Sequence, residues 1–164
     1  MSDLEQLYQQ VILDHARART GSGDLPEQYD GKSHQVNPTC GDEVTLAVSV
    51  DDKGIIDQIH WEGDGCSISQ ASLSVMSEML PGMAVDDREA TLEAFMKLMR
   101  SRGHDELSEE ELDLLGDANA FTGVAKFPAR VKCALLGWMA LKDALAQAQN
   151  SGTDTEELPE GENK

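Results

Sequence analysis

The segment VTLAVSVDDKGIIDQIHW, residues 44–61, determines the architecture that we expect. In its first half, Val or Leu at every second position alternates with a small or hydroxyl side chain, as in a strand with one buried face. Residues 51–54, DDKG, predict a turn, after which Ile55, Ile59 and Trp61 continue the pattern on a second strand. The segment therefore predicts an antiparallel hairpin, and residues 33–36 are expected to add a third strand.

Helical patterns lie on both sides of this hairpin. Upstream, apolar side chains recur every three or four residues between positions 4 and 15. Downstream, helices are expected at 67–80 and 87–100, after Ser108, and from a first turn that holds Pro128. Ser67 and Gln70 have the spacing of a capping box. The sequence therefore predicts an α+β fold, in which a small antiparallel three-stranded sheet packs against several helices.

The composition limits the possible functions. Asp and Glu number 31 against 13 Lys and Arg, a formal net charge of −18, so binding to nucleic acid is not expected. The longest apolar run, residues 133–141, is far shorter than the roughly 18–20 residues of a membrane span. The N-terminal residues show no secretory signal. We expect a soluble, cytoplasmic protein with one domain at residues 1–148 and an acidic, disordered tail at residues 149–164.

Three cysteines occur in contexts that suit metal binding. Cys40 and Asp42 flank a glycine before the hairpin, where a sharp turn lets both side chains reach one ion. Cys66 follows GDG at a junction from strand to helix, where the helix dipole stabilises a thiolate. Cys133 lies in the final helix, one turn after Arg130, whose charge is placed to stabilise a nearby thiolate.

Together these residues offer three sulfurs and one carboxylate oxygen, a donor set that suits tetrahedral Zn²⁺. Taken singly, each cysteine has a simpler explanation. Cys40 could be a chance residue in a turn, Cys66 a small residue under a tight turn, and Cys133 a core residue. The residues alone leave both interpretations open.

Four segments resemble a known family. They are LYQQVILDH at 7–15, NPTCGD at 37–42, GCSIS at 65–69 and RVKCALLGW at 130–138. In this order and spacing, they are similar to the SufU branch of the IscU/NifU family of iron–sulfur cluster assembly proteins. Lys132 stands where scaffold proteins of the IscU type usually carry a histidine, and the acidic segment near residues 102–120 resembles an insertion of the SufU branch.

The resemblance implies a fold of the IscU/SufE type with Zn²⁺ held by Cys40, Asp42, Cys66 and Cys133. It also implies a sulfurtransferase, in which Cys40 accepts persulfide sulfur from a SufS-type cysteine desulfurase and relays it to the SufBCD scaffold complex. Two alternatives stay open. One is an iron–sulfur cluster assembly scaffold of the IscU type, and the other is a structural zinc domain that only binds a partner.

Overall fold

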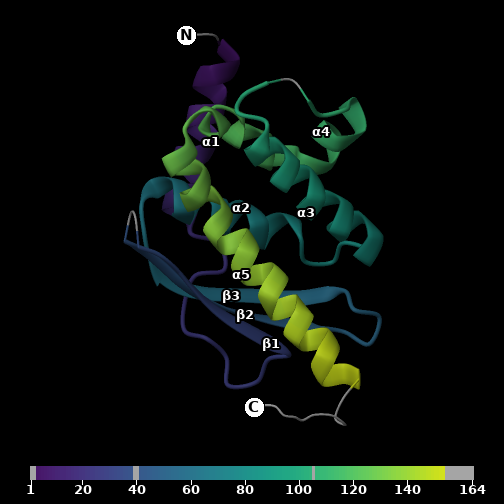
Figure 1. The fold of residues 1–164 in the computed structure, drawn as a ribbon. Coiled ribbons are helices and arrows are strands. Elements are labelled where there is room, and N and C mark those ends of the chain that lie inside the picture. The colour runs from purple at the N-terminus through teal and green to yellow at the C-terminus, as the bar shows by residue number, and fades with distance from the viewer. Residues whose placement is uncertain (1–2, 39–40, 105, 154–164) are drawn as a thin grey trace.

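Three antiparallel strands form one sheet, in the order β1-β2-β3 (Figure 1). The strands are β1 (Gly31–Asn37), β2 (Asp42–Val50) and β3 (Ile56–Asp64). The structure is a computed structural model that describes residues 3–38, 41–104 and 106–153, and it describes side chains as far as residue 149. Leu46 pairs with Ser33 on one side and with Trp61 on the other. The predicted three-stranded sheet is confirmed. Each strand also extends to polar residues at one end, which the alternation of apolar side chains does not predict.

Helices pack on the sheet and on one another. The helical elements are α1 (Asp3–Ala18), α2 (Ser67–Met79), α3 (Val85–Arg100), α4 (Glu109–Leu115), the 3₁₀ segments η1 (Gly116–Thr122) and η2 (Val124–Lys126), and α5 (Pro128–Thr153). Figure 1 shows α5 crossing the sheet, where it packs against β1 and β2, while α1 packs on α2 and η1. None of the described helices is long and apolar enough to cross a membrane.

Two predicted helix starts are found where the sequence placed them. Pro128 is the first residue of α5, and Ser108 is the N-cap of α4. The Ser108 hydroxyl accepts a hydrogen bond from the backbone N–H of Glu111 at 3.2 Å, and the Glu111 carboxylate accepts one from the backbone N–H of Ser108 at 2.9 Å. α5 continues to Thr153, past the boundary expected at residue 148, and residues 154–164 lie outside the described residues.

An aromatic cluster centred on Trp138 joins the helices. The Trp138 ring is fully buried and stacks on Phe95 of α3, with centroids 4.1 Å apart and an interplanar angle of 8°. Phe121 of η1 meets Phe95 edge-on at 6.0 Å. The Trp138 indole N–H donates to the Ser72 hydroxyl at 2.8 Å, so the buried donor is satisfied. This cluster thus connects α2, α3, η1 and α5, and its contacts involve none of Asp42, Cys66 and Cys133.

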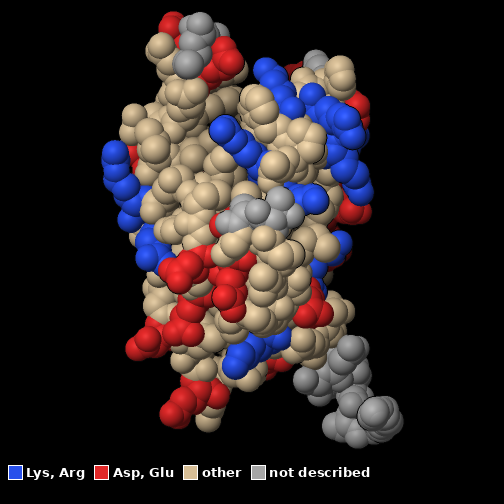
Figure 2. Space-filling model, turned by 60° about the vertical axis from the view of Figure 1, so that its left-hand side comes forward, with Lys and Arg blue, Asp and Glu red and all other residues tan. Residues whose placement is uncertain are grey.

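Charged side chains are unevenly distributed over the surface. Figure 2 shows acidic side chains gathered in the lower half of one face, with most Lys and Arg side chains of that face in its upper half and at its left margin. Among the described residues, Asp42 is the only acidic side chain that is buried, at 2% exposed. Burial of a carboxylate is costly unless its environment compensates it, so Asp42 is a candidate for a functional role.

Candidate metal centre

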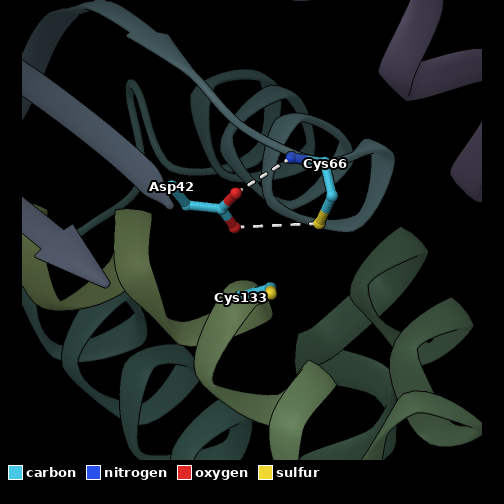
Figure 3. Close-up of side chains that lie close together, drawn as sticks. All are labelled: Asp42, Cys66 and Cys133. Carbon is cyan, nitrogen blue, oxygen red and sulfur yellow. Dashed lines mark hydrogen bonds between the residues drawn. The ribbon is translucent and has the colours of Figure 1, made fainter. Parts of the chain in front are cut away.

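Three of the four side chains predicted to bind metal lie together in the structure (Figure 3). Asp42 is the first residue of β2, Cys66 precedes α2, and Cys133 lies in α5. One carboxylate oxygen and the two sulfurs lie within 4.8 Å of one another. Cys40, the fourth predicted ligand, lies outside the described residues. Within the part of the chain that is described, this is the only group of three or more His, Cys, Asp or Glu side chains that could hold a metal ion.

Asp42 is oriented by the backbone of Cys66. Its Oδ1 accepts a hydrogen bond from the Cys66 N–H at 3.1 Å, and its Oδ2 lies 3.7 Å from the Cys66 sulfur. The hydrogen bond offsets part of the cost of burying the carboxylate. One carboxylate oxygen is therefore held by the chain, while the other faces a sulfur.

Cys66 is the N-cap residue of α2, which corrects the capping box predicted at Ser67. Cys66 has extended backbone angles, φ −72° and ψ 171°, and the helix begins at Ser67. Its carbonyl accepts hydrogen bonds from the Gln70 N–H and from the Ser69 hydroxyl, at 3.1 Å each. The Cys66 side chain makes no capping hydrogen bond, so an exposed sulfur lies at the positive end of the helix dipole.

Cys133 contributes a buried sulfur from the second turn of α5. The residue is 5% exposed, and its thiol lies 3.7 Å from the carbonyl oxygen of Ala129, one turn earlier. Figure 3 shows Cys133 facing the pair formed by Asp42 and Cys66. Because the helix holds this sulfur in place, Cys133 is suited to a fixed ligand position.

Arg130 is exposed in the first turn of α5. Its guanidinium lies over the Phe127 ring, 5.2 Å from the ring centroid. Arg130, Phe127 and Ile68 all line an open, mainly apolar groove of about 690 Å³ between α1 and the start of α5. The stabilisation of a thiolate by Arg130 stays a prediction.

Two glycines permit the close packing of Cys66 against Asp42. A Cβ atom at Gly65 would meet the Ser69 hydroxyl and would lie 3.0 Å from the Asp42 carboxyl group. A Cβ atom at Gly63 would meet the backbone carbonyl oxygen of Glu43, on the neighbouring strand. A larger residue would therefore not fit at either glycine of the sequence GDGC.

Sequence reasoning missed one contact at this site. Gln70 was expected to cap α2, but its side-chain Nε2 donates to the carbonyl oxygen of Gly65 at 2.8 Å. Gln70 lies one helical turn after Cys66, so its side chain can reach back to the residue before the cap. The sequence shows the spacing between Cys66 and Gln70, but it does not show that the Gly65 carbonyl oxygen is the acceptor.

The donor set fits zinc. Thiolates favour Zn²⁺ over Mg²⁺ and Ca²⁺, which take oxygen ligands. In a tetrahedral site with bonds of about 2.0–2.3 Å, ligand atoms lie about 3.5–3.8 Å apart. The 3.7 Å between Asp42 Oδ2 and Cys66 Sγ agrees with that spacing. The group of Asp42, Cys66 and Cys133 can therefore bind a metal ion of this class.

The chain is similar to curated proteins of iron–sulfur cluster assembly. The family model described as NifU-like N terminal domain matches residues 7–149. The chain is 36% identical over 148 residues to "Zinc-dependent sulfurtransferase SufU" of Bacillus subtilis (strain 168), with 90% of this chain and 95% of the relative covered. It is 37% identical over 166 residues to "Iron-sulfur cluster assembly scaffold protein IscU" of Streptococcus pyogenes serotype M1, with 99% and 98% covered.

Solved structures share the fold. A putative iron–sulfur cluster assembly scaffold protein for the SUF system, from Fervidobacterium islandicum AW-1, matches with a TM-score of 0.74 and 33% identity over 85% of this chain and 97% of that one. A NifU-like protein (N-terminal) from Brucella abortus matches with a TM-score of 0.75 and 25% identity, over 91% and 99%. These matches confirm the resemblance and the fold class predicted from the sequence. The chain belongs to the NifU-like N-terminal domain family of iron–sulfur cluster assembly proteins.

Proposed function

We propose that this chain is a zinc-dependent sulfurtransferase, which accepts persulfide sulfur from a SufS-type cysteine desulfurase at Cys40 and relays it to a SufBCD scaffold complex. The observation that carries the proposal is the convergence of Asp42, Cys66 and Cys133. The name of the Bacillus subtilis relative, a zinc-dependent sulfurtransferase, supports both the metal and the activity.

Asp42, Cys66 and Cys133 would hold the zinc ion, with Cys40 as the fourth ligand. When bound, zinc keeps its cysteine ligands deprotonated at neutral pH. Cys40 is two residues from Asp42, so the covalent chain keeps their Cα atoms within about 7 Å. Gly41 between them has a φ of 75°, which favours glycine and permits a sharp turn.

The proposed step exchanges one S–S bond for another. The Cys40 thiolate attacks the outer sulfur of a cysteine persulfide on the donor. The S–S bond of the donor breaks, the donor cysteine leaves as a thiolate, and a persulfide remains on Cys40. No external oxidant or reductant is needed because the number of S–S bonds is unchanged. Cys133 is a weaker candidate for this role, because it is buried in a helix.

The test is alanine release from cysteine by a SufS-type desulfurase, measured with and without this protein under mild reductant. We expect a saturable increase that disappears in Cys40→Ala. Ser67→Ala, which changes an exposed residue beside the site, is the matched control and should stimulate normally. A Cys40→Ala protein that stimulates the desulfurase as well as the wild type contradicts the role of Cys40.

A second candidate is an iron–sulfur cluster assembly scaffold, which the name of the Streptococcus pyogenes relative favours. The same thiolates would then hold a cluster during its assembly. Anaerobic reconstitution with iron and sulfide, followed by incubation with an apo acceptor, separates the two functions. Cluster transfer without stimulated alanine release supports the scaffold, and the opposite result supports the sulfurtransferase.

A further inference from the structure

The peptide group between Gly65 and Cys66 is held at both of its ends. Its N–H, which belongs to Cys66, donates to Asp42 Oδ1 at 3.1 Å. Its carbonyl oxygen, which belongs to Gly65, accepts from Gln70 Nε2 at 2.8 Å. Because a peptide group is planar, holding its carbonyl also fixes the direction of its N–H. Gln70 therefore acts on the direction of the N–H that binds Asp42.

The N-cap side chain of α2 makes no capping hydrogen bond. In a capping box, the side chain at the third helical position accepts a hydrogen bond from the N–H of the N-cap residue. Here the third position is Ser69, whose hydroxyl donates to the Cys66 carbonyl instead. The N–H of Cys66 is bound by Asp42, from a different element. Gly65 has no side chain to restrict its backbone, so Gln70 supplies a local constraint at this point.

We propose that Gln70 is a positioning residue of the metal centre, which acts through the Gly65–Cys66 peptide group on Asp42. While the Cys66 N–H holds Oδ1, Oδ2 faces the Cys66 sulfur at 3.7 Å. Without the Gln70 hydrogen bond, the peptide group can rotate, and Asp42 loses one of the contacts that orient its carboxylate. This inference rests on the metal site of the proposed function. Loss of such an outer contact weakens metal binding by about 10–100-fold.

The first experiment compares Gln70→Met with Gln147→Met. Methionine keeps the length and helix propensity of glutamine but cannot donate a hydrogen bond. Gln147 is an exposed glutamine on α5 and serves as the matched control. The probe is Co²⁺ added to the metal-free protein, whose thiolate charge-transfer and d–d absorption bands report the ligands. We expect Gln70→Met to weaken Co²⁺ binding about 10–100-fold and to shift the d–d bands. Gln147→Met should change neither.

The decisive experiment repeats Gln70→Met in an Asp42→Ala background. If Gln70 acts through Asp42, the second substitution should change Co²⁺ affinity less than about twofold once Asp42 is absent. The proposal is overturned if Gln70→Met weakens Co²⁺ binding by about 10–100-fold in the Asp42→Ala background as well. It is also overturned if the single variant Gln70→Met has the Co²⁺ affinity and the absorption bands of the wild type. If Gln70→Met fails to fold, Gln70→Glu removes the same donor at nearly the same shape and is tested in the same way.

The wild-type protein provides the reference that separates two failures. Wild-type protein that binds Co²⁺ without thiolate bands contradicts the metal site of the proposed function. Wild-type protein with normal thiolate bands, combined with an unaffected Gln70→Met variant, contradicts only the role of Gln70.

Discussion

Each described side chain of the candidate metal centre also belongs to a residue with a structural role. Asp42 binds the backbone N–H of Cys66, and Cys66 caps α2. Cys133 is part of α5. A ligand that also holds the backbone ties the geometry of the site to the path of the chain. The position of Gly65 is sensitive for this reason, since it lies against both Ser69 and Asp42.

Gly65→Ala should therefore weaken metal binding at least tenfold, a loss typical of disturbed supporting contacts. The new methyl group cannot fit without displacing the Ser69 hydroxyl or the Asp42 carboxyl group. Gly123→Ala is the matched control, because a Cβ atom there meets nothing within 4 Å and its φ of −68° suits alanine. Competition titration with a chromophoric chelator measures both affinities. Equal affinities for Gly65→Ala and Gly123→Ala would show that the loop adjusts freely.

At the scale of elements, the sequence predicts those features that depend on nearby residues. Alternating apolar side chains identify the core of β2, and the Ser108–Glu111 spacing identifies the start of α4. α2 begins at Ser67 as expected, but its N-cap is predicted one residue too late, because cysteine is an unusual N-cap and the partner of its N–H lies 24 residues away in sequence. The spacing of neighbouring residues cannot reveal the contact between the Cys66 N–H and Asp42. A capping residue whose hydrogen bonds come from a distant element is therefore what sequence reasoning misassigns here.

The pH dependence of stability should show the contribution of the α4 capping box. The backbone hydrogen bond from Ser108, and next the hydrogen bond from the Lys97 ammonium, lower the pKa of Glu111 below its ordinary value. A lowered pKa means that the folded state favours the carboxylate. The stabilisation is therefore complete above about pH 4.3, the ordinary glutamate pKa, and is lost as the pH falls through the lower folded-state pKa.

Urea unfolding of metal-free wild type and Glu111→Gln between pH 7 and pH 3 measures this contribution. The wild type should be more stable at pH 7, and the difference should shrink below about pH 4.3 as Glu111 becomes protonated. Glu110→Gln, at an exposed position on the same helix, is the control. A difference for Glu111→Gln that stays constant down to pH 3 contradicts the assigned cause.

At the scale of the molecule, the described side chains of the candidate metal centre lie outside the main cluster of buried apolar residues. The core depends on Trp138, Phe95 and their neighbours, and its contacts form without a metal ligand. The metal centre joins the start of β2 to the starts of α2 and α5. The sequence alone offered the ligand types, but only the resemblance to a family indicated that side chains up to 91 positions apart, Asp42 and Cys133, lie together. Spacing cannot predict such a convergence, because the whole fold produces it.

Metal removal should therefore leave a folded protein of lower stability. The core keeps its buried tryptophans, Trp61 and Trp138, in fixed surroundings, so chelation should preserve the near-ultraviolet circular dichroism. Metal at 1,000 times its dissociation constant stabilises a folded state by about 4 kcal/mol, so the melting temperature should fall on chelation. A Cys66→Ser/Cys133→Ser variant should melt at the same temperature with and without metal. Unfolding of the wild type on chelation would instead identify a structural zinc domain, because the metal, and not the core, would then supply the energy of folding.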